Sequence, residues 1–181
     1  MVKSIILDRD GTLVSDNGYV HKVEDFELLP GVIEGLKLLS KDFIFIVITN
    51  QSGVGRGEYT KEDMHKFNEK LISELKKENI GIKKIYFCLH IPEDNCDCRK
   101  PKTKNIEHAK KDFNIDMEKS WVIGDHLSDV ELGKRVGARA VYLLTGHGKK
   151  HSEDLTKNII KPDFIANNFL EAAEFIMRNS T

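Results

Sequence analysis

The sequence constrains the fold most strongly at residues 4–13, SIILDRDGTL, where an apolar run leads directly into an acidic turn. Residues 5–7 predict a short, fully buried strand. Asp8 and Asp10 follow at positions i and i+2, so on an extended chain both side chains face one ligand. Two close carboxylates repel unless a cation lies between them or one keeps its proton, and both arrangements suit phosphate chemistry. The simpler alternative is an acidic turn without a function, which becomes remote once the other strand ends are considered.

Strand-like and helix-like segments alternate along the rest of the chain. Apolar, strand-forming runs lie at residues 43–48, 83–88, 120–124, 138–144 and 162–166. Helical patterns lie at residues 31–40, 61–78, 104–113, 128–136 and 170–177. This order predicts an α/β fold with a Rossmann-like, doubly wound parallel sheet and helices on both faces. The polar stretch at residues 146–157 is predicted to be a mobile loop.

The helix over residues 61–78 has the clearest pattern. Its apolar residues recur at three- and four-residue spacing and predict one buried face made of Met64, Phe67, Leu71, Ile72 and Leu75. Thr60 stands three residues before Asp63, which predicts a capping box at the start of this helix.

Length and charge set broad limits. With 181 residues, 40% hydrophobic and 31% charged, the chain suits one domain spanning residues 1–181. The net charge of −1 gives no electrostatic basis for a nucleic-acid or membrane partner. The sequence contains no apolar run of membrane-spanning length and no recognisable signal peptide, so we expect a cytoplasmic, monomeric enzyme.

The residues that carry chemistry follow predicted strands. Asp8 and Asp10 follow the first strand, Thr49 and Asn50 the second, Arg99 and Lys100 come after the third, and Asp125 follows the fourth with Asp129 behind it. The carboxyl ends of parallel strands meet at one edge of the sheet, where ligands collect. We therefore expect these groups to surround a metal ion, a nucleophile and a bound anion.

Each of these groups also has a structural explanation when it is taken alone. Thr49 and the N–H groups after it could bind phosphoryl oxygens or could simply make a turn. Lys100 could offset charge in the transition state, although a lone lysine is more often solvated. Asp125 is expected to bind the metal, with Asp129 behind it, but Asp129 could also be an ordinary acidic residue of a first helical turn. Their joint placement at consecutive strand ends favours the functional interpretation.

All three cysteines fall in one eleven-residue window that also contains a histidine. The pattern Cys-x-His-x5-Cys-x-Cys supplies the four ligands of a closed tetrahedral zinc site, namely Cys88, His90, Cys96 and Cys98. We predict a structural zinc ion that clamps the loop carrying Arg99 and Lys100. The alternatives are thiols clustered by chance or a disulfide, which is disfavoured in a cytosolic protein.

The motifs DRDGT at residues 8–12, TN at 49–50, Lys100 and GD at 124–125 resemble the four motifs of the haloacid dehalogenase (HAD) superfamily of phosphohydrolases. The resemblance implies that Asp8 attacks phosphorus to give an aspartyl-phosphate, while Asp10 protonates the leaving oxygen and later activates water. It also implies that Mg²⁺ is held by Asp8, the main-chain oxygen of Asp10, and Asp125. Thr49 and Lys100 would steady the transferring phosphoryl group.

Only residues 13–30 separate the acidic turn from the first predicted helix, too few for a cap domain. We therefore expect the HAD fold without a cap, with an open site closed by loops for a large substrate or a small sugar phosphate. The Gly-rich loops at residues 16–21 and 51–57 suit sugar hydroxyls and a second phosphate, although both could be ordinary turns.

These loops, the zinc pattern and the CRKP sequence at residues 98–101 most resemble the heptose-1,7-bisphosphate 7-phosphatases of the superfamily. That resemblance implies a small phosphorylated sugar substrate and a heptose 1-phosphate product, an intermediate toward nucleotide-activated heptose for surface polysaccharide. Besides residues 8–10, the implied substrate contacts are Asp16, Asn17, Gly18, Tyr19, Thr49, Asn50, Gln51, Ser52, Arg99, Lys100 and His126. Arg99 would bind the distal phosphate, because its fork matches phosphate oxygens.

Two departures from that group leave alternatives open. His126 stands where such relatives often carry a lysine, which makes this contact less charged at neutral pH. The zinc loop is shorter than in many heptose phosphatases and closer to the histidinol-phosphate phosphatases, the main alternative. The loops at residues 17–21 and 52–57 favour the heptose enzymes. An alternative of another class is a non-catalytic binding module stapled by zinc, but the complete set of catalytic residues opposes it. A phosphotransferase is a further alternative, but the chain lacks the cap that would exclude water from the phospho-aspartate.

Overall fold

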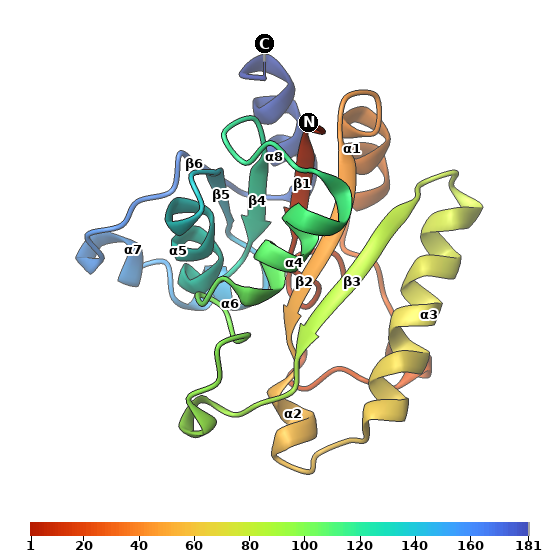
Figure 1. The fold of residues 1–181 in the computed structure, drawn as a ribbon. Coiled ribbons are helices and arrows are strands. Elements are labelled where there is room, and N and C mark those ends of the chain that lie inside the picture. The colour runs from red at the N-terminus through yellow and green to blue at the C-terminus, as the bar shows by residue number, and fades with distance from the viewer. Residues whose placement is uncertain (181) are drawn as a thin grey trace.

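The computed structural model describes residues 1–180, built around a six-stranded parallel sheet (Figure 1). The strands are β1 (Ser4–Leu7), β2 (Ile44–Asn50), β3 (Ile82–Cys88), β4 (Trp121–Gly124), β5 (Arg139–Leu143) and β6 (Phe164–Ala166). Their order across the sheet is β3-β2-β1-β4-β5-β6, and every neighbouring pair is parallel. The first strand of the chain therefore lies inside the sheet, between β2 and β4.

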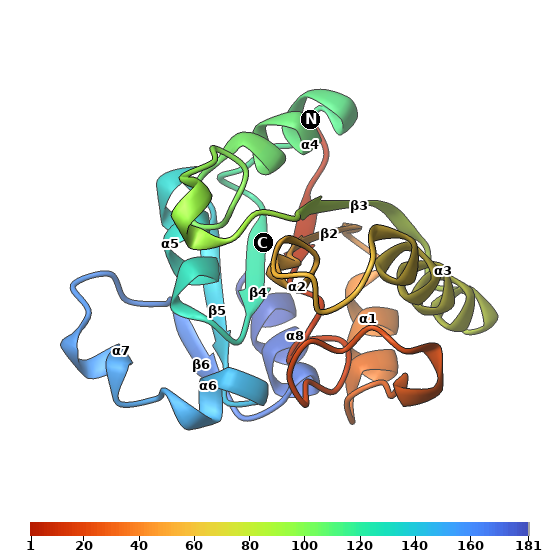
Figure 2. The same cartoon turned by 90° about the horizontal axis from the view of Figure 1, so that it is seen from below.

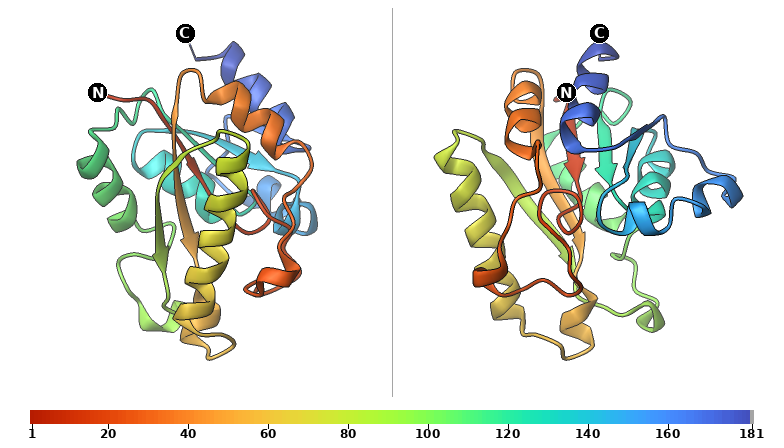
Figure 3. Two further views of the ribbon diagram at one scale, coloured as in Figure 1. Left: turned by 90° about the vertical axis from the view of Figure 1, so that its right-hand side faces the viewer. Right: turned by 180° about the vertical axis from the view of Figure 1, so that it is seen from behind.

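Helices cover both faces of the sheet, as the alternating pattern predicts. One face carries α1 (Val32–Leu39), α3 (Lys61–Lys77) and α8 (Phe169–Arg178), and the other carries α4 (Lys104–Phe113) and α5 (Leu127–Arg135). The two layers are seen on opposite sides of the sheet in Figure 3. The shorter helices are α2 (Ser52–Gly55), α6 (Gly146–Lys150), α7 (Asp154–Lys157), and the 3₁₀ helices η1 (Val23–Asp25) and η2 (Pro92–Asp94).

Strand β1 is buried on both faces. Ile5 and Leu7 belong to the core beneath α1, α3 and α8, whereas Ile6 belongs to the core beneath α4 and α5. Because successive side chains of a strand alternate between faces, a strand covered on both sides is apolar throughout. This explains why β1 appears in the sequence as an unbroken apolar run.

Helix α3 begins with the predicted capping box. The side-chain oxygen of Thr60 accepts the N–H of Asp63 at 3.1 Å, and the Asp63 carboxylate accepts the N–H of Thr60 at 3.0 Å. The expected burial of Ile72 is wrong, because this side chain is 39% exposed while Asn68 is buried. At about 100° per residue, Asn68 lies nearer the centre of the buried stripe than Ile72 does.

The prediction of a loop over residues 146–157 is also wrong, because α6 and α7 lie there. Two contacts tie this segment to the sheet edge: the Thr145 hydroxyl donates to the carbonyl of Gly11, and the N–H of His147 donates to the Asp125 carboxylate at 2.7 Å. Leu155 is buried against the end of the sheet. These anchors come from distant parts of the chain, so local composition does not reveal them.

As predicted, the described residues contain no separate cap domain between β1 and α1. Between β1 and α1, the described chain forms the 3₁₀ helix η1 and isolated bridges that join Val14 to Asp10 and to Leu28. Among residues 1–180, no helix has both the length and the apolar character needed to cross a membrane.

Candidate active site

The predicted site residues meet at the carboxyl ends of the strands, the edge that faces the viewer in Figure 2. Asp8 follows β1 and Asp125 follows the neighbouring strand β4, while Thr49 lies near the end of β2. The chain runs outward from β1 in one direction and from β4 in the other, so the boundary between them is the topological switch point of the sheet. Ligands of open α/β sheets bind at such a point.

A cavity of about 750 Å³ opens at this edge. It is lined by twelve of the predicted site residues, namely Asp8, Asp10, Asp16, Gly18, Tyr19, Thr49, Asn50, Ser52, Arg99, Lys100, Asp125 and His126. The lining within residues 1–180 does not include Asn17 or Gln51, whose substrate contacts stay predictions. Arg56, from the loop predicted to contact substrate at residues 51–57, also lines the cavity. Sequence reasoning assigned no role to the lining residues Tyr59, Leu127, Ser128, Glu131 and His147.

Lys100 lies inside an ion-pair cluster. Its Nζ is 2.8 Å from Asp8 Oδ1 and 2.7 Å from Asp129 Oδ1, and the lysine is only 4% exposed. Burial alone would lower the pKa of Lys100, but the charges of Asp129 and Asp8 outweigh burial and raise it. Lys100 is therefore a buried cation, and the solvated-lysine alternative is wrong.

Three carboxylates at this edge form a candidate magnesium site. Oxygens of Asp8, Asp125 and Asp129 all lie within 4.8 Å of one another. Burial raises the pKa of Asp125 to about 8, and the charges of Asp8 and Asp129 add to this effect. Burial likewise raises the pKa of Asp8, although Lys100 opposes it. A cation with oxygen ligands would relieve this repulsion, so the donor set fits Mg²⁺.

Gly11 leaves room for this acidic cluster. Its φ is +72°, and a Cβ on it would lie 2.1 Å from Oδ2 of Asp125. Both the left-handed backbone and the close approach require glycine. The turn after β1 thus brings the main chain against the carboxylate that follows β4.

Asp10 is held by a residue to which sequence reasoning gave no separate role, Arg9. Arg9 is fully buried, and its Nε and Nη2 donate to the two oxygens of Asp10 at 2.7 and 3.0 Å. The guanidinium also donates to Asn68 and to the carbonyl of Val20. A buried charge is stable only with several hydrogen-bond partners. The sequence signal for this role of Arg9 was therefore a charged residue directly after a fully buried strand.

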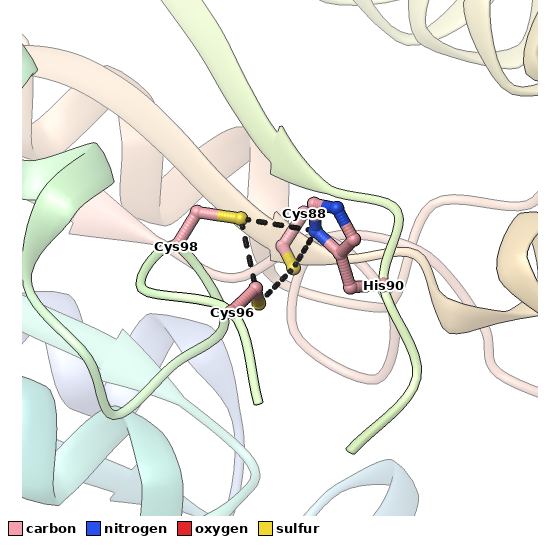
Figure 4. Close-up of side chains that lie close together, drawn as sticks. All are labelled: Cys88, His90, Cys96 and Cys98. Atoms are coloured by element: carbon pink, nitrogen blue, oxygen red, sulfur yellow. Dashed lines mark hydrogen bonds between the residues drawn. The ribbon is translucent and has the colours of Figure 1, made fainter. Parts of the chain in front are cut away.

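The four predicted zinc ligands point toward one another (Figure 4). Sulfur–sulfur and sulfur–nitrogen distances within the set of Cys88, His90, Cys96 and Cys98 run from 3.4 to 3.6 Å. A tetrahedral zinc site with ligand bonds near 2.3 Å has edges of about 3.8 Å, whereas a disulfide bond is about 2.05 Å long. The geometry therefore fits a zinc site better than a disulfide.

The electrostatics of Cys96 also suit a metal ligand. Burial raises its pKa, but hydrogen bonds from the N–H groups of Cys98 and Arg99 outweigh burial and lower it to about 7. Because thiolates bind zinc, this favours the ligand form near neutral pH.

Asn50 joins the loop that carries the four predicted zinc ligands, residues 88–100, to the sheet. Its side-chain oxygen accepts the N–H of Lys100 at 3.0 Å, and its side-chain nitrogen donates to the carbonyl of Lys100 at 3.3 Å. The end of β2 thus fixes the backbone of Lys100 from one side, while the cysteine cluster holds the loop from the other.

The remaining predicted contacts lie on the cavity walls. Asp16 accepts the N–H of Gly18 at 2.8 Å and lies 3.3 Å from the Nε2 of His147. His126 accepts the N–H of Ser128 and caps α5, and burial lowers the pKa of its ring, which disfavours a charged side chain there. Arg99 donates to the carbonyl of His90 at 3.4 Å.

Comparisons with known proteins agree with this geometry. Residues 97–172 match the family described as HAD-hydrolase-like. The D-glycero-alpha-D-manno-heptose-1,7-bisphosphate 7-phosphatase of Campylobacter jejuni is 38% identical over 149 residues, which cover 82% of this chain and 86% of the relative. The D-glycero-beta-D-manno-heptose-1,7-bisphosphate 7-phosphatase of Helicobacter pylori strain J99 is 42% identical over 161 residues, covering 87% and 92%.

A solved structure shows the same fold along almost the whole chain. It is the D,D-heptose 1,7-bisphosphate phosphatase of B. bronchiseptica, complexed with magnesium and phosphate. Its TM-score is 0.88 at 25% identity, and the match covers 98% of this chain and 99% of the other.

Proposed function

Because the chain belongs to the heptose-1,7-bisphosphate 7-phosphatase family of HAD-like hydrolases, we propose that it removes the 7-phosphate of D-glycero-D-manno-heptose 1,7-bisphosphate. The observation that carries this proposal is the buried cluster in which Lys100 contacts Asp8 and Asp129 at the switch point of the sheet. Such a cluster supplies a nucleophile and a fixed cation, which phosphoryl transfer through an aspartyl-phosphate requires.

The reaction follows from the two aspartates of the first turn. An oxygen of Asp8 bonds to phosphorus while the bond from phosphorus to the sugar oxygen breaks, and Asp10 gives that oxygen its proton. Asp10 then takes a proton from water as the water oxygen attacks the phosphorus of the aspartyl-phosphate. This releases inorganic phosphate and restores the Asp8 carboxylate, while Lys100 and Thr49 hold the phosphoryl oxygens.

We assign magnesium binding to Asp8, Asp125 and the main-chain oxygen of Asp10. The ion would supply positive charge to the phosphoryl oxygens and to the buried carboxylates. Asp129 acts behind this set, because one of its oxygens contacts Lys100 and the other accepts the N–H of His126. Its role is to hold Lys100 in place.

The second phosphate of the substrate would bind at the cationic side of the open cavity. Arg56 and Arg99 both line the cavity, and Arg99 directly follows the zinc ligand Cys98. Zinc would thus fix Arg99 and Lys100 together, one cation for each phosphate of a bisphosphate. The ammonium group of histidinol phosphate is a poorer partner for Arg99, so this arrangement favours the heptose substrate.

The test is steady-state release of inorganic phosphate, with Mg²⁺ present, from both anomers of heptose 1,7-bisphosphate and from histidinol phosphate. Both anomers are included because the relatives are named for each of them. We expect kcat/KM to be about 100-fold higher for the better anomer than for histidinol phosphate, from the contacts of the second phosphate.

Arg99→Ala is the matched variant, because it should reduce this preference without removing the nucleophile. A higher kcat/KM for histidinol phosphate would replace the proposed substrate. Turnover of none of these phosphates would instead support a zinc-stapled binding module.

A further inference from the structure

A hydrogen-bond network centred on Gln51 lies behind the turn at residues 8–12 that follows β1. The Gln51 amide nitrogen donates to Asp10 Oδ2 at 2.7 Å and to the Thr49 hydroxyl at 2.8 Å. Its amide oxygen accepts from Arg9 Nη2 at 2.9 Å and from the Tyr59 hydroxyl at 2.6 Å. All four hydrogen-bonding positions of this buried amide are therefore filled.

Arg9 fixes which way the amide faces. A guanidinium can only donate hydrogen bonds, so the group it contacts on Gln51 must be the oxygen. The nitrogen consequently faces Asp10 and Thr49. Since the Thr49 oxygen accepts this N–H, the Thr49 hydroxyl keeps its own proton free to donate to a phosphoryl oxygen in the cavity.

The same network distinguishes the two oxygens of Asp10. Among the described residues, Oδ2 accepts from both Arg9 and Gln51, whereas Oδ1 accepts from Arg9 alone. Oδ1 therefore has the free lone pair on which Asp10 can carry the proton for the leaving group. The amide of Gln51 determines this difference because its nitrogen occupies Oδ2.

Tyr59 is held rigidly against this amide. It is 7% exposed, and its ring stacks on His21 with 4.6 Å between the ring centroids and an angle of 10° between the planes. A Cβ on Gly53 would lie 2.1 Å from the Tyr59 ring, so helix α2 packs directly on the tyrosine. Burial raises the pKa of Tyr59 to about 12, which keeps its hydroxyl a donor at neutral pH.

We propose that Tyr59 is a positioning residue for proton transfer by Asp10, acting through the amide of Gln51. The proposal rests on the phosphatase mechanism above. Without the tyrosine hydroxyl, Arg9 is the remaining partner of the Gln51 oxygen among the described residues. The oxygen still faces Arg9, but the amide is held by one contact in place of two and its nitrogen is positioned less firmly against Asp10. Protonation of the leaving oxygen then becomes slower, while attack by Asp8 on phosphorus is affected less.

This role has a signature that a purely structural role lacks. A sugar alkoxide is a poor leaving group and needs the proton of Asp10, whereas p-nitrophenolate departs without protonation. Tyr59→Phe should therefore lower kcat/KM for alkyl phosphates more than for p-nitrophenyl phosphate. From the loss of one hydrogen bond we expect a decrease of about tenfold for alkyl phosphates and about twofold for the aryl phosphate.

The experiment measures wild type and Tyr59→Phe on heptose 1,7-bisphosphate, glycerol phosphate and p-nitrophenyl phosphate. Tyr86→Phe is the matched control, because Tyr86 is also a buried tyrosine whose hydroxyl donates to a carboxylate, that of Asp112 at 2.6 Å, and it lies outside the cavity lining. We expect this control to keep wild-type ratios among the three substrates. Thermal unfolding of both variants separates a loss of stability from a loss of positioning.

Equal decreases for alkyl and aryl phosphates, or no decrease for either, would overturn the proposal. If the wild type hydrolyses glycerol phosphate but not heptose bisphosphate, the proposed substrate is wrong. The role of Tyr59 is then still decided by comparing glycerol phosphate with p-nitrophenyl phosphate. If the wild type hydrolyses no alkyl phosphate at all, the proton-transfer role of Asp10 fails, and the role of Tyr59 fails with it.

Discussion

At the scale of single residues, Lys100 shows how the acidic site is balanced. Asp8, Asp125 and Asp129 bring three buried or half-buried carboxylates together, and Lys100 contacts two of them. One lysine does not neutralise three acids. The site is therefore short of positive charge by itself and is suited to a divalent cation and a phosphate that arrive together.

The nucleophile assignment is tested by Asp8→Asn. An amide does not form the aspartyl-phosphate, so kcat should fall by about 10³-fold or more. The zinc content and the circular dichroism spectrum should stay at wild-type values, because Asp8 lies outside the cysteine cluster. Asp112→Asn, which alters a carboxylate outside the cavity lining, serves as the control. Retained turnover in Asp8→Asn would refute the assignment.

The pKa of Asp125 predicts how stability depends on pH without magnesium. Its pKa is raised from 3.8 to about 8 in the folded protein, first by burial and then by Asp8 and Asp129. Between these values the folded chain holds a proton that the unfolded chain has lost. The contribution of Asp125 to stability is therefore full below about pH 4 and is lost as the pH rises to about 8.

With a chelator present, the midpoint temperature of unfolding should therefore fall more from pH 5 to pH 8 for the wild type than for Asp125→Asn. Effects of the buffer should be about equal for the two proteins. Magnesium should raise the wild-type midpoint at the higher pH, because it binds the folded state alone. Identical pH profiles for the two proteins, or an equal magnesium shift in both, would contradict the assignment.

The sequence predicted the residues of this site better than their hydrogen bonds. Asp8, Thr49, Lys100 and Asp125 follow strand ends, and parallel strands bring those ends together, so local patterns were sufficient to find them. The buried partners of Asp10 are its neighbour Arg9 and the distant Gln51, which is held in turn by Tyr59. A single sequence indicates that a buried Arg9 needs partners, but it does not show that Gln51 and Tyr59 complete the network.

At the scale of structural elements, the loop at residues 88–100 would become a cross-link between β3 and α4 if its cysteine cluster binds zinc, and it carries two cavity residues, Arg99 and Lys100. Cys88 ends β3, and Cys98 immediately precedes Arg99 and Lys100. Asn105 in α4 donates to the carbonyl of Cys98 at 3.2 Å. The metal would therefore control the position of Lys100 as well as the stability of the loop.

Cys96→Ser tests this cross-link. The variant should bind less than one equivalent of zinc, unfold at a lower temperature and lose kcat, because Lys100 is no longer held from the loop side. The matched control is Asp97→Asn, which lies between two ligands but has an exposed side chain paired with Lys104. Metal analysis, thermal unfolding and phosphate release are the three measurements. Unchanged zinc content in Cys96→Ser would remove the zinc assignment.

The strands and the long helices were predictable from the sequence, and the short helices were not. Helix α4 has the predicted bounds, and the other main helices and strands differ by only a few residues, because hydrophobic period and capping signals determine them. Helix α2 and helices α6 and α7 were read as loops. They have four or five residues each, too few for a periodic pattern, and tertiary contacts such as that from His147 to Asp125 hold α6 in place.

At the scale of the whole molecule, the alternation of strands and helices correctly predicted a parallel sheet covered on both faces. It did not determine the order of the strands. That order places β1 between β2 and β4, and it creates the switch point where the cavity opens. Without a cap, the walls of the cavity come from the loops that follow the strands.

The interior position of β1 has a consequence for synthesis on the ribosome. Strand β1 is synthesised before both of its neighbours in the sheet, and one of them, β4, ends only at Gly124. Until that segment has left the exit tunnel, an apolar strand with an open edge is exposed to other nascent chains. Chaperone protection is therefore most needed before β4 has emerged, and the candidate site can form only after Asp125 has been synthesised.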